Sequence, residues 1–349
     1  MKERKNIDPE NVSKIQGKRK ETLSDEMLFN GLVQGNKTML SRAITLIEST
    51  SPAHKKRANA LIERCLAQED QSLRIGITGV PGVGKSTFIE AFAKRLTDMK
   101  MKVAVLAVDP TSQKNKGSIM GDKTRMPELS KNEHAFIRPS PSGQSLGGVA
   151  RKTRETIMLC EAAGYDVVLV ETVGVGQSET MVHGMVDFFL LLKLAGAGDE
   201  LQGIKRGIIE MADTIVINKA DGDNLKRARL AQQDFKRALQ LYPPKENGWV
   251  PEVCCCSALE KTGISQLWEL MDAYFKKNKE TTFFRSKRAH QNREWLLQTI
   301  EERLRDDFYT HQKIRDALER YIVEVSDGKL SPFSAAERLL KLKNEGKKP

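Results

Sequence analysis

A run of nine residues carries the pattern of a phosphate-binding loop: Gly79-Val80-Pro81-Gly82-Val83-Gly84-Lys85-Ser86-Thr87. It fits G-x-x-x-x-G-K-[ST], in which glycines let backbone amides turn inward around a phosphate and the following helix adds its positive dipole end. Lys85 is expected to reach the β- and γ-phosphates, and the Ser86 hydroxyl to ligate Mg²⁺. An apolar run before the loop (73–78) and an amphipathic one after it (87–96) predict the flanking strand and helix. An ordinary glycine-rich turn is disfavoured, because Lys-Ser is in register and a second nucleotide motif follows.

That second motif is Asn218-Lys219-Ala220-Asp221, which closes the apolar run 213–217. It matches N-K-x-D, the signature that reads guanine. The Asp221 carboxylate can accept hydrogen bonds from guanine N1–H and the 2-amino group, whereas adenine would leave it unpaired. Ser257-Ala258-Leu259 follows another apolar run and fits the last guanine-contacting loop. GTP is therefore predicted over ATP.

Acidic residues that could serve Mg²⁺ occur at three further places. Asp109 and Glu171 each follow an apolar run, and Asp122 lies in the polar stretch 117–126. A carboxylate at the end of a buried strand is well placed to bind Mg²⁺ or the water molecules that the ion carries. Taken singly, each acid also fits a helix cap or a surface charge. The backbone N–H of Gly174 is expected to bond the γ-phosphate and to move when that group leaves.

Two segments predict loops. Residues 111–151 have little periodicity, and a loop of that length is usually functional or disordered. Residues 194–205 contain three glycines and end in charged residues. A solvated connection and a switch ordered by a partner fit this second segment equally well.

The elements around these motifs alternate strand and helix. Apolar runs predict strands at 73–78, 102–108, 166–171, 186–192, 213–218 and 252–256. We therefore expect an α/β fold with a mostly parallel sheet covered on both faces. The expected parts are a basic disordered tail (1–24), a helical extension (25–70), a nucleotide-binding domain (71–280) and a C-terminal helical arm (281–349). The arm is not expected to bury its apolar faces alone, so it should dock on the core or pair with a second subunit.

Composition restricts the class of protein. The 349 residues are 39% hydrophobic and 30% charged, with a net charge of +11 that lies partly in the basic ends. These ends fit solvated tails or attraction to an acidic partner. No apolar run is long enough for a membrane span, no secretory signal is expected, and nothing favours nucleic acid.

The five cysteines form no spaced framework, which predicts the reducing cytoplasm. Three of them are adjacent, Cys254-Cys255-Cys256. A metal site is the alternative, but successive residues of a strand face opposite ways. Small buried hydrophobic side chains are the favoured reading.

Together these residues resemble the MeaB/ArgK-type GTPases, the bacterial relatives of the MMAA protein. The resemblance is carried by the phosphate loop and by four other stretches: Gly-Asp-Lys-Thr-Arg-Met (121–126), Arg-Pro-Ser-Pro (138–141), Glu-Thr-Val-Gly-Val-Gly-Gln-Ser-Glu (171–179) and Gly-Asp-Glu-Leu-Gln-Gly-Ile-Lys-Arg-Gly-Ile (198–208). The last two stretches are far more specific than a phosphate loop. The resemblance runs from about residue 26 into the C-terminal arm. Two departures lie in loops: Lys116 replaces a usual glycine and Ala195 a common proline.

The resemblance implies a P-loop NTPase G domain of the signal-recognition-particle/MinD-like class, with N-terminal and C-terminal helical extensions. It implies a homodimer that binds GTP/GDP and Mg²⁺ and serves as a GTP-driven chaperone of an adenosylcobalamin-dependent acyl-CoA mutase, methylmalonyl-CoA mutase above all. Such proteins gate cofactor loading and help remove damaged cofactor. By position, Lys85 and Ser86 would serve phosphate and Mg²⁺. Asp109, Asp122 and Glu171 would serve Mg²⁺ and the attacking water, Asp221 guanine, and Lys205 a partner-ordered switch loop.

Three other functions are alternatives. A nickel-inserting GTPase should carry a His-rich stretch, but the five histidines are scattered. An ATP-dependent kinase or ATPase linked to basic amino-acid transport conflicts with the guanine motif. A non-catalytic scaffold would keep the phosphate loop for nucleotide binding alone, and it would be distinguished by the absence of GTP turnover.

Overall fold

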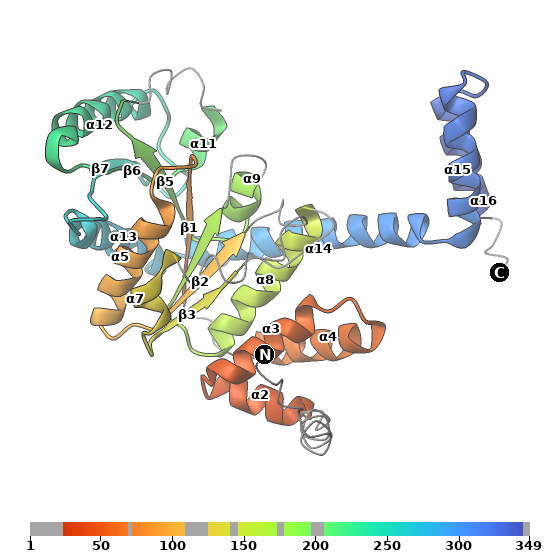
Figure 1. The fold of residues 1–349 in the computed structure, drawn as a ribbon, viewed down its shortest axis with the longest axis horizontal. Coiled ribbons are helices and arrows are strands. Elements are labelled where there is room, and N and C mark those ends of the chain that lie inside the picture. The colour runs from red at the N-terminus through yellow and green to blue at the C-terminus, as the bar shows by residue number, and fades with distance from the viewer. Residues whose placement is uncertain are drawn as a thin grey trace, which may run out of the picture. The chain divides into compact units, whose positions relative to one another are not determined.

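The computed structural model describes residues 24–68, 72–108, 125–139, 146–172, 178–196 and 206–344. The chain forms two compact units, one ending at Thr281 and one beginning at Thr282. Figure 1 shows the elements of both. No helix within the described ranges is long and apolar enough to cross a membrane.

A seven-stranded sheet forms the centre of the first unit, in the order β3-β2-β4-β1-β5-β6-β7. Every neighbouring pair is parallel. Because strands of a parallel sheet are buried on both faces, they appear in the sequence as continuous apolar runs. The strands that follow β1 in the chain lie first on one side of it (β2, β3 and β4) and then on the other side (β5, β6 and β7). Open parallel sheets bind ligands at such a switch point, beyond the carboxyl ends of the strands. The strands are β1 (Leu73–Gly79), β2 (Val103–Val108), β3 (Ala135–Arg138), β4 (Val167–Thr172), β5 (Phe188–Leu194), β6 (Thr214–Asn218) and β7 (Glu252–Cys255).

The sequence prediction of the sheet is confirmed for every strand except β3, which it missed. The expectation of a loop across residues 111–151 is wrong where the structure describes this segment. It contains a helical turn, α7 (Pro127–Ser130), then β3, and then the start of α8 (Leu146–Ala162). The four residues of β3 are too few to show a period, although Ala135, Phe136 and Ile137 are buried.

Helices cover both faces of the sheet (Figure 1). On one face α8 packs against β2 and β4 in a single apolar cluster that includes Leu106 and Val170. On the other face lie α5 (Lys85–Asp98) and α13 (Ile264–Lys279), where Phe92 and Trp268 have ring centroids 6.2 Å apart. This unit also contains α9 (Ser178–His183), α11 (Arg206–Met211), the short 3-10 helix η2 (Gly222–Asn224) and α12 (Leu225–Leu239).

Three N-terminal helices extend the first face: α2 (Asp25–Val33), α3 (Lys37–Glu48) and α4 (Pro52–Leu66). Ser24 caps α2 by accepting a hydrogen bond from the Met27 amide, and Asn36 caps α3 in the same way. The buried side chains of all three helices join the cluster that contains α8 and β2. They therefore share one core with this face of the sheet.

The second unit consists of α14 (Phe283–Tyr309), α15 (Gln312–Ser326) and α16 (Pro332–Asn344). Its own buried cluster is small, with Ile314, Ala317 and Leu339 at the centre. Several large apolar side chains of α14 are exposed: Leu296, Leu297, Ile300 and Leu304.

Candidate functional site

The predicted phosphate loop joins the end of β1 to the start of α5. Gly84 caps the helix with φ of 91°, and a Cβ atom there would lie 2.9 Å from Asn218 Nδ2. Glycine is therefore required by both backbone conformation and close approach. No side chain in the described structure caps α5. The first amides of a helix have no intrahelical acceptor, so those of α5 can receive an anion.

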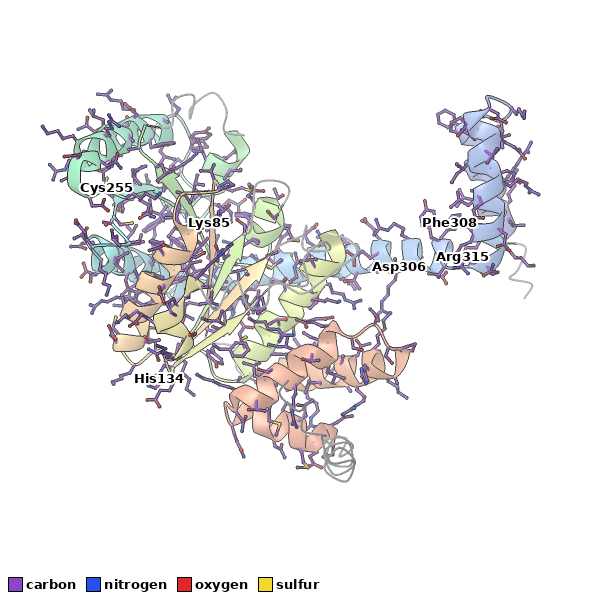
Figure 2. The ribbon with its side chains drawn as sticks, in the orientation of Figure 1. Lys85, His134, Cys255, Asp306, Phe308 and Arg315 are labelled. Atoms are coloured by element: carbon purple, nitrogen blue, oxygen red, sulfur yellow. The ribbon has the colours of Figure 1, made fainter. Side chains whose placement is uncertain are left out.

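Lys85, the first residue of α5, lies at the end of β1 (Figure 2). Its Nζ donates hydrogen bonds to the carbonyl oxygens of Gly79 (2.7 Å) and Val80 (3.3 Å). Burial lowers the pKa of Lys85, and the carboxylates of Glu171 and Glu179 act in the opposite direction. A partly desolvated ammonium at the loop can exchange these carbonyls for phosphate oxygens.

The N-K-x-D residues contact the phosphate loop directly. Asn218 ends β6 and is 1% exposed. Its Nδ2 donates to Val83 O at 2.9 Å, and its Oδ1 accepts from the Ala258 amide at 3.3 Å. Lys219, in the left-handed region with φ of 58°, donates through Nζ to Gly82 O at 2.9 Å. The structure thus brings the two predicted nucleotide motifs and the 257–259 loop together.

The Asp221 carboxylate is oriented by its neighbour in the 257–259 loop. The hydroxyl of Ser257, fully buried, donates to Asp221 Oδ2. Ser257 Oγ in turn accepts from the Glu260 amide at 3.1 Å. One carboxylate oxygen is thereby fixed, and the other is available for the donors of a guanine base. Ala258 is buried and Leu259 is exposed beside it.

Glu171 lies on β4, an inner strand of the sheet, opposite Ile77 of β1 and Ala107 of β2. Its side chain is 6% exposed. The next residue, Thr172, donates a hydrogen bond to Thr78 Oγ1 at 2.9 Å and joins the ends of β4 and β1. Because all strands are parallel, their carboxyl ends share one edge of the sheet with the phosphate loop.

Two of the predicted metal ligands can be assessed for their fit to Mg²⁺. Ser86 follows Lys85 in the first turn of α5, and its hydroxyl makes no hydrogen bond to any residue that the structure describes. Glu171 supplies a buried carboxylate, whose negative charge favours the protonated form of Lys85 and so raises its pKa. A free hydroxyl and a carboxylate at this edge are hard oxygen donors, which suit Mg²⁺.

Four predicted site residues lie outside the described residues: Asp109, Asp122, Gly174 and Lys205. Asp109 directly follows Val108, the last residue of β2. Lys116, where the sequence departs from the family pattern, also lies outside them, whereas Ala195 packs against the cluster formed by α12 and β6. The roles of the four site residues remain predictions.

Glu179 is a further residue of this site, one that its sequence context did not single out. This residue is in the first turn of α9 and is 4% exposed, and its negative charge raises the pKa of Lys85. The available signal was its place at the end of the specific 171–179 stretch. A buried acid that faces the phosphate-loop lysine belongs to the electrostatics of this site.

The three adjacent cysteines lie beside the base-reading loop. Cys256 is 1% exposed, and burial raises the pKa of its thiol to about 12. Its Sγ lies 3.5 Å from Asn218 Oδ1. A neutral, buried thiol packs as a small apolar side chain. No group of three His, Cys, Asp or Glu side chains with metal-binding geometry occurs among the described residues.

Comparison with known proteins gives consistent matches. The family model described as methylmalonyl Co-A mutase-associated GTPase MeaB matches residues 40–313. The chain is 46% identical over 326 residues to the methylmalonic aciduria type A homolog, mitochondrial, of Mus musculus, covering 90% of this chain and 79% of that protein. It is 44% identical over 308 residues to GTPase ArgK of Escherichia coli, covering 88% and 93%. A crystal structure of an LAO/AO transport system kinase is 36% identical, with a TM-score of 0.72 and coverage of 97% and 99%.

Proposed function

The chain belongs to the MeaB family of P-loop GTPases, and on this premise we propose that it is the GTP-driven chaperone of an adenosylcobalamin-dependent acyl-CoA mutase. Hydrolysis of GTP is the activity of the family. The observation that supports its assignment to this site is the hydrogen bonding of Asn218 to Val83, which joins the base-reading and phosphate-binding loops.

Guanine is the proposed base. Asp221, held by Ser257, offers an acceptor for guanine N1–H and the 2-amino group, and adenine lacks both donors. The bound nucleotide would contact residues of three loops, together with Gly174: Gly79, Val80, Pro81, Gly82, Val83, Gly84, Lys85, Ser86, Thr87, Asn218, Lys219, Asp221, Ser257, Ala258 and Leu259.

In the proposed reaction, Lys85 binds the β- and γ-phosphate oxygens and Ser86 the Mg²⁺ ion. Asp109, Asp122 and Glu171 serve the ion and the attacking water. The ion, when bound, neutralises charge that develops on the phosphates. Because these residues include no arginine to stabilise that charge, we expect slow intrinsic turnover that rises when a partner binds. Lys205 is proposed for a loop that this partner orders.

The proposed partner is a mutase such as methylmalonyl-CoA mutase, and the product of the GTPase cycle is a conformational change that gates cofactor loading and removal of damaged cofactor. The names of the matching family and of the mouse relative support this partner. The proposed compartment is the cytoplasm, consistent with five cysteines that are all free thiols.

We also propose a homodimer formed through the C-terminal arm, residues 281–349. The second unit buries few apolar side chains and leaves Leu296, Ile300 and Leu304 of α14 at 60%, 45% and 64% exposure. An apolar stripe of this kind marks an interaction surface. The remaining proposed parts are the tail 1–24, the helical extension 25–70 and the GTPase domain 71–280.

The test is transfer of adenosylcobalamin to a purified acyl-CoA mutase from the same source, followed by the visible spectrum of the cofactor. The protein loaded with a non-hydrolysable GTP analogue and the protein loaded with GDP should bind the mutase with different affinities and should gate transfer differently. Equal binding and equal transfer in both nucleotide states would overturn the chaperone function. Lys85→Ala protein serves as the control that cannot hold the triphosphate.

A further inference from the structure

The buried thiol of Cys256 has a hydrogen-bond partner in the base-reading motif. Cys256 directly follows β7 and is 1% exposed. Its Sγ donates to Asn218 Oδ1 at 3.5 Å. The Ala258 amide donates to the same oxygen at 3.3 Å. The side-chain oxygen of Asn218 is therefore held by two donors from one loop.

These donors bear on the orientation of the Asn218 amide. The two ends of a side-chain amide differ, since the oxygen accepts hydrogen bonds and the NH₂ group donates them. With Oδ1 facing the thiol and the Ala258 amide, Nδ2 faces Val83 O of the phosphate loop at 2.9 Å. A rotated amide would place donors against donors on one side and an oxygen against an oxygen on the other. The thiol thus favours the orientation that reaches the phosphate loop.

The main chain at Cys256 is fixed independently of its thiol. The Cys256 amide donates to Ile217 O, and the Cys256 carbonyl oxygen accepts from the Ala220 amide, each at 2.9 Å. These two hydrogen bonds bracket Asn218 and Lys219. A substitution at position 256 that fits the space leaves these hydrogen bonds in place and changes what faces Asn218.

The space at this position suits a small side chain. A Cβ atom added to Gly263, the residue that caps α13, would lie 3.1 Å from both Cα and Cβ of Cys256. The main chain at Gly263 therefore passes close to Cys256. Serine and alanine are no larger than cysteine and can replace it without displacing this segment.

The charges around the thiol keep it a donor. Burial raises the pKa of Cys256 to about 12, and the nearby Asp221 carboxylate adds to this. The thiol is therefore protonated at neutral pH, and its S–H can donate to the amide oxygen of Asn218.

We infer that Cys256 is a positioning residue for guanine-nucleotide binding, whose thiol holds the Asn218 side chain in the orientation that joins the base-reading motif to the phosphate loop. This inference rests on the proposed use of Asn218 and Asp221 to bind GTP. It gives one of the three adjacent cysteines a role beyond packing.

Two substitutions separate the donor from the volume of the side chain. Cys256→Ser and Cys256→Ala both remove the large sulfur atom, but only serine keeps a donor, and a hydroxyl donates more strongly than a thiol. The dissociation constants of GDP and of a non-hydrolysable GTP analogue, kcat for GTP, and Tm are measured for each variant.

Cys255 provides the matched control. Its Sγ also donates at 3.5 Å, but to the carbonyl oxygen of Ala228 in α12 and not to the base-reading motif (Figure 2). Cys255→Ala and Cys255→Ser should leave both dissociation constants unchanged, whatever they do to Tm.

We expect Cys256→Ala to weaken the binding of both nucleotides about fivefold, as the loss of one hydrogen bond allows, with kcat within about twofold because no group at the phosphates is replaced. Cys256→Ser should bind both nucleotides within about twofold of the wild type, because its hydroxyl restores the donor. In an Asn218→Ala background, Cys256→Ala should cause no further loss of affinity, since a residue that acts through another is not additive with it.

Wild-type affinity in Cys256→Ala, with or without a lower Tm, would overturn the inference. Equal losses in Cys256→Ala and Cys256→Ser would overturn it as well, because volume and not the donor would then explain the effect. A full fivefold further loss in the Asn218→Ala background would show that Cys256 does not act through Asn218. Equal affinity of the wild type for GDP and ADP is a different result, because it removes the proposed reading of guanine and the inference with it.

Discussion

The side-chain amide of Asn218 donates a 2.9 Å hydrogen bond to the carbonyl oxygen of Val83, a residue 135 positions earlier in the chain. The same side chain accepts from the Ala258 amide. Three loops that would surround one nucleotide are thus connected through a single buried amide. Base recognition and phosphate binding become one structural unit.

Replacing Asn218 by Ala should weaken both the site and the fold. The carbonyl of Val83 and the amide of Ala258 would lose their partner, at a cost of about 2–3 kcal/mol in the free energy of unfolding. Chemical denaturation measures this loss, and nucleotide titration should show a parallel fall in GTP affinity. Asn224→Ala, which removes an exposed bond to Lys219 O, is the control and should have a smaller effect. Equal effects of the two substitutions would contradict the connecting role of Asn218.

Changing Asp221 to Asn should alter which base is bound. The variant should lose at least about 100-fold in GTP affinity, because an amide donor then faces the donors of guanine. Xanthine carries a carbonyl where guanine has its 2-amino group, so affinity for XTP should rise. Competition between the two triphosphates is the measurement. Asp223→Asn, an exposed carboxylate two residues away, is the control. Retained GTP preference in Asp221→Asn would show that this carboxylate does not read the base.

Lys85→Ala should abolish GTP hydrolysis. The ammonium that would contact the γ-phosphate disappears, and no other site residue proposed here replaces it. Phosphate release measures the rate. Lys94→Ala on the same helix removes only a surface pair with Glu128 and should leave the rate intact. Turnover by Lys85→Ala at the wild-type rate would mean that the phosphate loop has been assigned wrongly.

The lowered pKa of Lys85 predicts a pH dependence. In the nucleotide-free fold its pKa is below the ordinary 10.5 because of burial, so between these two values the folded chain binds fewer protons than the unfolded chain. The free energy of unfolding therefore rises with pH in this window through Lys85. Phosphates favour the charged amine, so GTP binding in the same window should take up a proton.

Calorimetric titration of GTP in two alkaline buffers with different ionisation enthalpies measures this proton uptake. Lys85→Arg, whose guanidinium stays charged, should bind without it. The same proton uptake in wild type and Lys85→Arg would assign the titration to another group.

If the exposed apolar side chains of α14 form the dimer interface, introducing carboxylates among them should dissociate the dimer. Ile300→Glu combined with Leu304→Glu should convert the protein from the mass of two chains to that of one in sedimentation velocity, because apolar area of α14 is lost from the interface. Gln298→Glu, on another side of the helix, should remain dimeric. A wild-type protein that sediments as one chain would contradict the proposed homodimer.

The sequence predicted the parts of this protein that depend on local pattern. Long apolar runs define six strands, and a strand followed by a glycine-rich loop and a helix defines the site of Lys85. These features follow from residue types at short spacing, which sequence alone contains. The meeting of the phosphate loop with Asn218 was also foreseeable, since both follow parallel strands whose ends share one edge.

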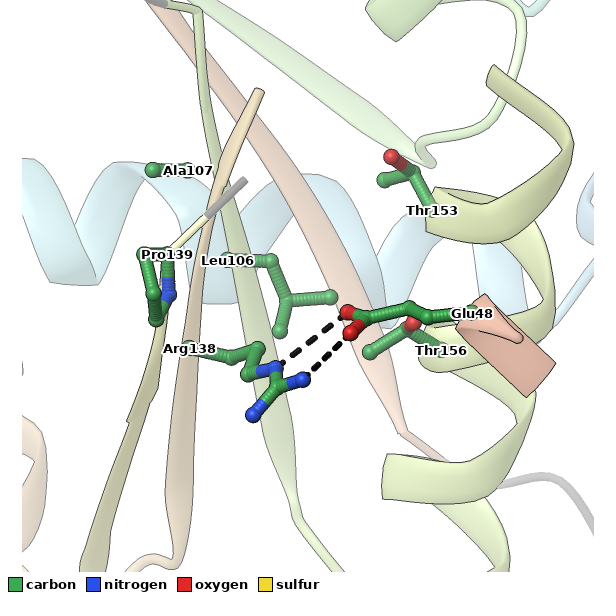
Figure 3. A pocket seen from close by; sticks show the side chains of 7 residues that line it. All are labelled: Glu48, Leu106, Ala107, Arg138, Pro139, Thr153 and Thr156. Carbon is green, nitrogen blue, oxygen red and sulfur yellow. Dashed lines mark hydrogen bonds and ion pairs between the residues drawn. The ribbon is translucent and has the colours of Figure 1, made fainter. Parts of the chain in front are cut away.

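The parts that depend on distant contacts could not be predicted. β3 is too short for a periodic signal. Two of its contacts come from distant residues: Lys37 donates to Ala135 O, 98 positions away, and Glu48 accepts from Arg138, 90 positions away (Figure 3). Glu179 looks like an ordinary helix-start acid until the fold buries it near Lys85. Each of these features arises from tertiary packing, which no local window records.

The most direct test of the proposed function is hydrolysis of GTP and of ATP, each with and without a purified adenosylcobalamin-dependent acyl-CoA mutase from the same source. A GTP-driven mutase chaperone should show slow turnover that is specific for GTP and rises when the mutase is added. A GTP rate that no such mutase changes would contradict the chaperone function, and preference for ATP would contradict the reading of Asp221 as well.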